Sequence, residues 1–194
     1  MMNNLPVILL RGLVLLPFND LKLEFENDDS RNVIDNALIF HDGKILVVTQ
    51  DDASDINPNI DTLPHIGVVA NISHKMLLPN GKVRVVITGM RRVIIDLYNK
   101  RDTLEASIID SGEEAIDSLE EQAIIRKVSR ELDIYIRNVP NIGNSVISKL
   151  STIKKLDEFT DVLAPTLPIT LDRLNSYLKE LKASERARMI LLDV

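Results

Sequence analysis

The sequence predicts an α+β fold in which a β-rich lobe, residues 1–110, is followed by a helical lobe, residues 111–194. Short runs of Val, Ile and Leu separated by Gly, Pro, Asn and Asp fill the first part, a pattern typical of strands and turns. At Ser111 the spacing of apolar residues changes from the strand period of about 2 to the helical period of about 3.6. Of the 194 residues, 45% are apolar, so the chain can bury a core without disulfides.

The β-rich lobe is expected to contain short strands and one short helix. In the second strand apolar and charged residues alternate, which predicts one dry face and one wet face. Asn80-Gly81 lies between two alternating apolar runs and is the strongest short signal for a hairpin. A polar loop rich in Asp, residues 51–64, precedes this hairpin. We expect the helix at 28–41 and strands at 5–10, 21–26, 44–50, 66–78, 82–97 and 103–110.

The helical lobe is expected to begin with a long helix. Ser111 and Glu114 have the spacing of a capping box at its start, and Pro140 ends it. Thr170 is the predicted cap of a later helix and Ser184 that of the final one. Shorter helical patterns cover 142–150, 156–163 and 171–181.

The final helix carries an apolar stripe that continues to the last residue without a Gly, Asn or Pro to end it. Its members are Ala187, Ile190, Leu191 and Val194. Because a helix seldom stops in the middle of such a stripe, we expect the chain to be the amino-terminal part of a longer protein. The stripe would then pack within that longer chain.

The composition excludes several kinds of chemistry. The chain has no Cys, which excludes disulfides, thiol nucleophiles and thiolate metal sites. Neither Gly-Lys pair, at 43–44 and 81–82, has the flanking residues of a P-loop. The three histidines are too far apart in sequence to form a recognisable metal motif: His41, His65 and His74. We therefore expect no catalytic residue, no metal site and no cofactor in this chain.

Charge and aromatic content disfavour nucleic acids and membranes as partners. The formal net charge is −6, which repels a phosphate backbone. Three Tyr, four Phe and no Trp leave few rings on which bases could stack. The apolar stretch near the amino terminus, residues 5–18, is interrupted by Pro, Arg and Gly and is too short to cross a bilayer. No targeting signal is recognisable.

One segment departs from this acidic balance. Residues 82–101 contain six basic residues and the single acid Asp96, a local net charge of 6 − 1 = +5. Its central cations form a candidate basic patch, Arg84, Arg91 and Arg92. We interpret the segment as a solvated strand face or as an intramolecular patch opposite the acidic 51–64 loop. Contact with nucleic acid is the minor alternative.

Several segments, taken in order, resemble a known family. They are Leu5–Pro17, the strand ending Leu46–Asp51, His65–Ile72 and the hairpin segment Leu78–Arg92. Together they resemble the amino-terminal domain of the Lon family of ATP-dependent proteases. The resemblance is strong over residues 5–110 and rests mainly on the helix pattern afterwards. The family commonly has Gly and Met after Pro17, where this chain has Phe18-Asn19-Asp20, so the shape of that turn is left open.

The resemblance implies a PUA-like β lobe followed by a helical bundle lobe. It implies that this chain is a non-catalytic substrate-recognition and assembly domain, with unfolded or misfolded proteins as partners. The full-length protein would be a cytoplasmic homo-oligomer, a hexamer, engaged in protein quality control. Its ATPase module, with ATP and magnesium, and its serine peptidase module with a Ser-Lys dyad would lie outside this chain. The alternative is a stand-alone PUA-like module that binds RNA through the basic patch or acts as a protein adaptor.

Unfolded proteins differ from folded ones in exposing apolar side chains, so a recognition domain needs apolar groups that face solvent. Two loops supply such residues. We predict that the substrate-binding candidates are Leu16, Pro17 and Phe18 at one turn, and Met76, Leu77, Leu78 and Pro79 before the hairpin turn. Met suits this role because its flexible side chain adapts to varied partners.

Overall fold

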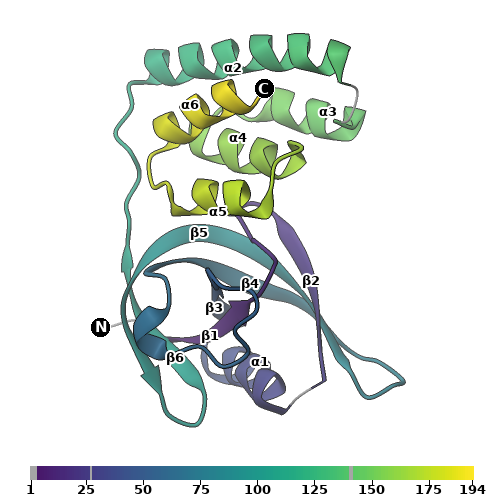
Figure 1. Ribbon diagram of the computed structural model, residues 1–194, viewed down its shortest axis with the longest axis vertical. Helices are drawn as coiled ribbons and strands as arrows, with labels where there is room; N and C mark the ends of the chain where they lie inside the picture. Colours follow the sequence, from purple (N-terminus) through teal and green to yellow (C-terminus); the bar gives the residue numbers. More distant parts are fainter. Residues whose placement is uncertain (1–3, 27, 140–141) are drawn as a thin grey trace. The chain divides into compact units, whose positions relative to one another are not determined.

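The computed structural model describes residues 4–26, 28–139 and 142–194 (Figure 1). The chain divides into two compact units, Met1–Ser111 and Gly112–Val194. We call them the β unit and the helical unit. The mixed sheet and the helices together confirm the predicted α+β class.

The β unit is built on one six-stranded sheet with the order β2-β5-β4-β3-β1-β6. β5 also pairs with β6, so five of the strands close into a ring while β2 adds to it through β5 alone. β1 and β3 run parallel, and the other pairs are antiparallel. The strands are β1 (Asn4–Leu10), β2 (Asp20–Phe25), β3 (Lys44–Thr49), β4 (Ile66–Leu77), β5 (Val83–Lys100) and β6 (Leu104–Asp110).

β5 has 18 residues and pairs with three strands. Register shifts interrupt its ladders with two of them. Such bulges bend a strand and increase its twist. Two shifts interrupt its ladder with β4, and one, between Ile95 and Leu97, interrupts its ladder with β6. A side chain at Gly89 would place its Cβ 2.6 Å from the carbonyl oxygen of Leu16. Glycine therefore lets the chain entering β2 cross closely over β5.

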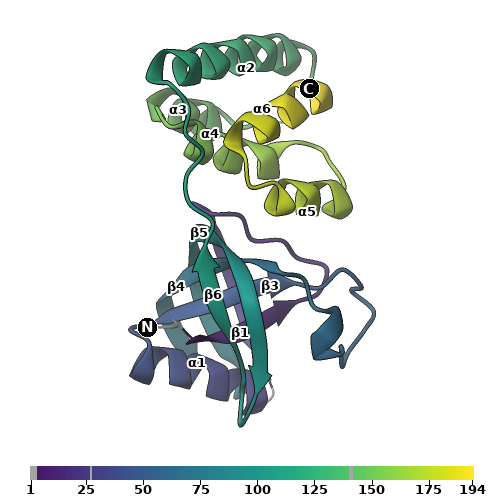
Figure 2. The same cartoon turned by 90° about the vertical axis from the view of Figure 1, so that its left-hand side faces the viewer.

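The core of the sheet is aliphatic, as the composition predicts. Its central cluster comes from the five strands of the ring: Leu5, Val7, Leu46, Val48, Val69, Val93, Ile95 and Ala106. Helix α1 (Asp28–Phe40) buries Val33, Ile34 and Ala37, and Figure 2 shows it at the lower end of the sheet in that view. Asp42 and Gly43, both at positive φ, end the helix and lead into β3. A short 3-10 helix, η1 (Ile60–Thr62), lies in the 51–64 loop.

The helical unit is packed around α4, most of whose residues are buried. Phe159 and Leu163 of that helix lie in the same apolar interior as Tyr177 and Ile190. Thr170 caps α5 as predicted, because its side chain accepts a hydrogen bond from the amide of Arg173. The elements are α2 (Ser118–Asn138), α3 (Asn144–Thr152), α4 (Leu156–Leu163), η2 (Ala164–Thr166), α5 (Leu171–Lys179) and α6 (Ala183–Asp193).

The predicted N-cap of the first long helix, Ser111, is wrong by six residues. α2 begins at Ser118, and Asp117 is its N-cap, whose carboxylate accepts from the amide of Leu119. Gly112 has a φ of 73°, which no helix continues through. The capping box does not form because Glu114 binds elsewhere. The predicted stop at Pro140 lies outside the described residues.

Glu114 instead binds the first turn of α6. Its carboxylate accepts from the backbone amide of Ser184 at 2.9 Å and from the Ser184 hydroxyl at 2.5 Å. Ser184 is therefore not the cap that the sequence predicts. The N-cap of α6 is Lys182, which makes no side-chain capping bond. A carboxylate 70 positions away supplies the missing acceptor.

A buried cation joins α6 to α4. Arg186 is fully buried, and its guanidinium donates to the hydroxyl of Thr160 at 3.1 Å and to the carbonyl of Glu180 at 2.8 Å. It also pairs with Asp157 and lies 3.5 Å from the equally buried carboxylate of Asp161. A buried charge needs such partners, since desolvation without them is costly.

Within the described residues, no helix has the length and apolar character needed to cross a membrane. The same residues contain no group of three or more His, Asp or Glu side chains placed to hold a metal ion.

Candidate functional site

The hairpin of β4 and β5 presents apolar side chains to solvent at its outer end. Met76 is 57% exposed and Leu77 is 72% exposed, while Leu78 is half-buried and Pro79 is exposed. The turn is closed by a hydrogen bond from the amide of Leu78 to the carbonyl of Lys82, at 2.8 Å. The hairpin that the Asn80-Gly81 pair predicts is confirmed.

Polar contacts fix this outer end against α1. Lys75 pairs with Asp35 of α1 at 2.6 Å. Arg31, one helical turn earlier, donates to the carbonyl of Gly81 at the turn. The turn itself needs glycine at this position, because Gly81 has a φ of 82°.

Two ion pairs fix the hairpin against β2 and the residue after it. Arg84 pairs with Glu24 at 2.6 Å, and Lys82 pairs with Glu26 at 2.7 Å. The hydrogen bond and the charge of Lys82 lower the pKa of Glu26, and the same contact raises the pKa of Lys82. The exposed apolar residues therefore lie on a hairpin that polar contacts join to α1 on one side and to β2 on the other.

Met76 and Leu77 point to opposite faces of the hairpin, as consecutive strand residues do. Met76 lies opposite Arg84, and Leu77 lies opposite the buried Val83, which pairs in turn with Phe25 of β2. Leu77 therefore lies on the same face of the sheet as the apolar Val83 and Phe25. Met76 lies on the opposite face, beside the charged pair of Arg84 and Glu24.

The other predicted group of candidates is mostly buried. Leu16 is 1% exposed and Pro17 is buried as well, so the expectation that these two face solvent is wrong. The reason is the close crossing over Gly89, against which the backbone of both residues packs. Phe18 alone of this group is exposed, at 36%.

Phe18 adopts the backbone conformation that glycine favours, with a φ of 66°. Its amide donates to the carbonyl of Gly89 at 2.9 Å, and the Asn19 side chain donates to the carbonyl of Pro17 at 2.9 Å. These bonds hold the turn although a bulky residue adopts a conformation that favours glycine. Met90, beside Gly89, is also 39% exposed.

The predicted basic patch is largely neutralised by acids of the same unit. Arg84 pairs with Glu24, Arg91 pairs with Asp110 at 2.9 Å, and Arg92 is only 6% exposed. The acids come from β2 and from the end of β6, so the expectation that the acidic 51–64 loop faces these cations is not met for these pairs. Ion pairs leave less free positive charge for a phosphate.

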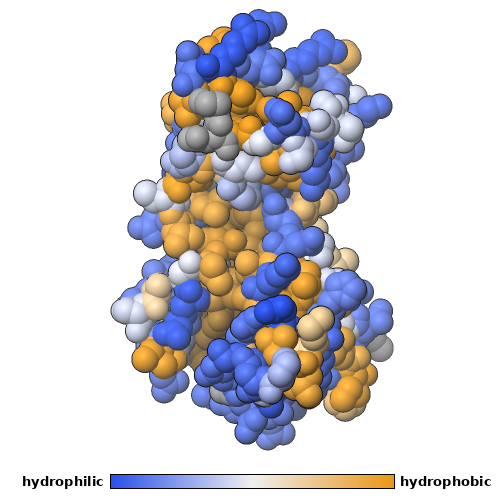
Figure 3. Space-filling view, turned by 90° about the vertical axis from the view of Figure 1, so that its right-hand side faces the viewer, coloured by the Kyte–Doolittle hydropathy of each residue, from blue (hydrophilic) through white to orange (hydrophobic). Residues whose placement is uncertain are grey.

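Among the exposed apolar residues that the sequence does not predict, three lie on α1 and in the 51–64 loop. Ile39 is 70% exposed, Phe40 75% and Ile56 82%. Ile39 and Phe40 do not share the helical spacing of the buried residues of α1. This difference in spacing is the sequence signal that could have predicted their exposure. Figure 3 shows apolar side chains exposed on one face of both units, among hydrophilic ones.

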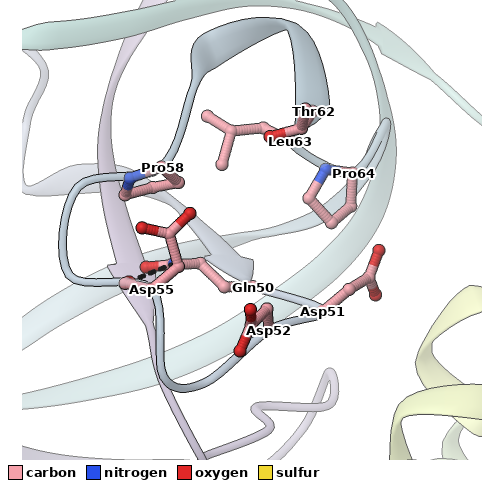
Figure 4. Close-up of a pocket in the computed structure, with 8 residues that line it drawn as sticks. All are labelled: Gln50, Asp51, Asp52, Asp55, Pro58, Thr62, Leu63 and Pro64. Carbon is pink, nitrogen blue, oxygen red and sulfur yellow. Dashed lines mark hydrogen bonds between the residues drawn. The ribbon is translucent and has the colours of Figure 1, made fainter.

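A pocket of about 180 Å³ lies beneath the 51–64 loop. Figure 4 shows the side chains around it, with the amide of Gln50 donating to the carbonyl of Asp55 at 3.0 Å. Hydrogen bonds from Ser54 lower the pKa of Asp52. The pocket is lined by Gln50, Asp51, Asp52, Asp55, Pro58, Thr62, Leu63 and Pro64. The carboxylates bind neighbouring loop residues, so they organise the loop.

Comparison with known proteins identifies the family. The family described as the ATP-dependent protease La (LON) substrate-binding domain matches residues 4–192. The chain therefore belongs to this family, and the predicted resemblance is confirmed.

Curated relatives are proteases much longer than this chain. Lon protease of Brevibacillus choshinensis is 28% identical over 188 residues, which cover 96% of this chain and 24% of that protein. Lon protease 1 of Bacillus subtilis is 27% identical over 189 residues, 97% of this chain and 24% of that protein. The chain thus spans about a quarter of the length of these relatives.

Solved structures show the same fold. The N-terminal domain of Mycobacterium avium complex Lon protease superposes with a TM-score of 0.79 and 19% identity, covering 97% of this chain and 96% of that one. The Lon N-terminal domain protein from Xanthomonas campestris gives a TM-score of 0.67 and 15% identity, covering 98% of both chains.

Proposed function

We propose that this chain is the non-catalytic domain with which a Lon-family ATP-dependent protease binds its protein substrates, unfolded or misfolded proteins and selected regulatory proteins, in the cytoplasm. Membership of the substrate-binding family supports this role. The observation that carries it in the molecule is the pair of exposed apolar residues, Met76 and Leu77, on a hairpin held by ion pairs.

The physical basis is the difference between folded and unfolded chains. A folded protein hides most of its large apolar side chains, so apolar groups displayed in water bind unfolded segments preferentially. A rigid display binds more tightly than a mobile one because less conformational freedom is lost on binding. The ion pairs of the hairpin provide that rigidity without covering Met76 or Leu77.

The catalytic steps of the proposal belong to the rest of the protein. The ATPase module with ATP and magnesium, and the peptidase module with its Ser-Lys dyad, would follow this domain in the chain. The full-length protein would assemble as a homo-hexamer. In this arrangement the domain captures a segment and the ATPase pulls it toward the peptidase.

The apolar residues of the hairpin can be removed without disturbing its fold. Replacing Met76 and Leu77 together by serine removes apolar surface without touching a buried residue. We expect the affinity for a permanently unfolded, fluorescently labelled protein to fall roughly five- to thirtyfold, since the loss of about 1–2 kcal/mol corresponds to that range. Fluorescence anisotropy measures it.

Ile56→Ser is the matched control, because Ile56 is 82% exposed but lies in the 51–64 loop. It should bind like the unsubstituted chain. Equal losses in the control and the hairpin variant would mean that general hydrophobicity, and not the hairpin, governs binding.

The dependence of binding on salt concentration distinguishes RNA binding from binding of unfolded protein. Phosphate contacts weaken steeply as salt rises, while apolar binding changes little or strengthens. We expect binding of the unfolded protein to persist at high salt. The charge pairing of Arg84 and Arg91 supports the protein-binding role over the RNA-binding one.

A further inference from the structure

β2 is a sheet edge whose second side has no partner strand. All of its six residues pair with β5, in a continuous register from Asp20 opposite Thr88 to Phe25 opposite Val83. No other strand of the described residues pairs with it. The other five strands form the closed part of the sheet, whereas β2 pairs along its whole length with a single strand (Figure 1, the purple strand labelled β2).

The direction of the backbone groups along β2 follows from one hydrogen bond. The amide of Gly89 donates to the carbonyl of Asn19 at 2.9 Å, which continues the register of the β2 and β5 ladder. In an antiparallel pair, hydrogen-bonded residues alternate with residues whose backbone groups point away. Leu21 and Leu23 therefore bond to β5, while Lys22 and Glu24 direct their amides and carbonyls outward.

Two of the devices that usually protect an edge, proline and bulges, are missing from β2. Natural edges are blocked by proline, bulges or charged side chains. None of its six described residues is proline, and its ladder with β5 has no register shift. Two of its acids are bound back toward β5, since Asp20 accepts from the hydroxyl of Thr88 at 2.6 Å and Glu24 pairs with Arg84. The Lys22 side chain is the remaining charge on the strand.

The apolar face of β2 is also incomplete at this edge. Leu23 is buried, but Leu21 and Phe25 on the same face are only half-buried. A further strand with apolar residues at alternate positions would cover them, because neighbouring strands pack side chains of one face together.

We propose that the free edge of β2 binds an extended segment of an unfolded polypeptide as an additional β-strand. The segment pairs with the outward backbone groups of Lys22 and Glu24, and its alternate apolar side chains cover Leu21 and Phe25. Every unfolded chain carries unpaired amides and carbonyls, so this mode recognises the unfolded state without demanding a sequence. The inference rests on the proposed function and specifies how the substrate is held.

The test uses the 194-residue chain and two short synthetic peptides of alternating valine and threonine with lysine at both ends. One peptide is unmodified, and the other carries N-methyl groups on every valine and threonine, which remove the donors of both edges but keep the side chains. We expect the methylated peptide to bind roughly tenfold or more weakly, since several hydrogen bonds are lost.

Amide exchange locates the bound strand. In the ¹⁵N-labelled chain, the amides of Lys22 and Glu24 should exchange rapidly when free and become protected when the unmodified peptide binds. The amides of Leu21 and Leu23 should be protected in both states. Protection confined to the hairpin residues Met76 and Leu77 would overturn the proposal.

Substitution at Lys22 separates backbone from side chain. Lys22→Pro removes an outward amide that no strand uses in the free domain, and proline is tolerated at such edge positions. It should weaken binding of the unmodified peptide roughly tenfold, whereas Lys22→Ala, which keeps the amide, should not. Thermal melting monitors the fold of both variants, and the exchange experiment decides the case if Lys22→Pro fails to fold.

The failures are distinguishable. Equal binding of both peptides, with the hairpin variant still defective, would overturn strand addition and leave the proposed function standing. Failure of the chain to bind the peptides or any unfolded protein would overturn both. Protection of Lys22 and Glu24 that depends on protein concentration and not on peptide would assign the edge to a second copy of this chain, and would also overturn the proposal.

Discussion

Phe18 shows how a single residue can be held in an unfavourable conformation next to a candidate binding surface. A positive φ costs a non-glycine residue about 1–2 kcal/mol, and Phe18 has a φ of 66°. The surrounding bonds to Gly89 and from Asn19 to Pro17 outweigh that cost. The side chain of Phe18 is 36% exposed.

This strain leads to a prediction that compares two substitutions. Phe18→Gly and Phe18→Ala both remove the ring, but only glycine relieves the backbone. We expect the glycine variant to be about 1 kcal/mol more stable than the alanine variant in urea unfolding. Both should bind unfolded protein equally weakly if the ring contacts substrate. Equal stability of the alanine and glycine variants would show that the backbone conformation at residue 18 is not strained.

At the scale of the element, the capping of α6 illustrates a contact that local sequence cannot reveal. Glu114 stands in an extended segment, yet its carboxylate receives the amide and hydroxyl of Ser184. Desolvation raises the pKa of Glu114, but the bonds from Ser184 and the nearby cations Lys182 and Arg186 outweigh it, so the pKa lies below its usual 4.5.

The contribution of Glu114 to stability depends on pH. Since the pKa of Glu114 is lower in the folded chain than in the unfolded one, its stabilisation is complete above about pH 4.5 and is lost as the pH falls through the folded value. Glu114→Ala should lower the stability of the helical unit by about 1 kcal/mol at neutral pH, as loss of a cap does. The difference should shrink in acid.

Glu113→Ala is the control, since the neighbouring Glu113 is exposed. Urea unfolding followed by helical circular dichroism at neutral and acid pH measures both variants. A Glu114→Ala deficit that stays constant with pH would contradict a role for the charged form.

The elements themselves were largely predictable because their signals are local. Asn80-Gly81 fixes the hairpin, and Thr170 fixes the start of α5. The start of α2 was not predictable from Ser111, because the partner of Glu114 lies 70 positions away. The pairing of β1 with β3 and the closure of the ring by β1 on β6 likewise depend on long-range packing that a one-dimensional pattern does not contain.

The candidate surface was predictable only in part for the same reason. Met76 and Leu77 are exposed as expected, since a hairpin extends beyond the sheet. Leu16 looks equally exposed in the sequence, but the crossing over Gly89 buries it. The open edge of β2 is a property of strand order, which becomes visible only when all six strands are placed.

At the scale of the whole molecule, the chain forms two compact units. We expect a substitution that destabilises one unit to leave the stability of the other unchanged. Arg186→Met leaves the buried Asp161 without its cation, a change that costs about 3–5 kcal/mol. Hydrogen exchange should show loss of protection throughout α4 and α6 and unchanged protection in β3 and β4.

Arg188→Met is the matched control, because Arg188 lies on the same helix but its side chain is 73% exposed. Its effect should stay within about 0.5 kcal/mol. Loss of protection in the β unit of the Arg186 variant would show that the two units unfold as one.

The sheet order also determines when the β unit can fold. β1 pairs with β6, with Asn4 opposite Ser107, so the ring cannot close until the ribosome has released nearly all of this unit. Pairings between such distant residues form slowly. A nascent chain therefore passes through a stage in which β1 has β3 on one side and nothing on the other. During its own synthesis the domain presents the same kind of unpaired strand that we propose it binds in others.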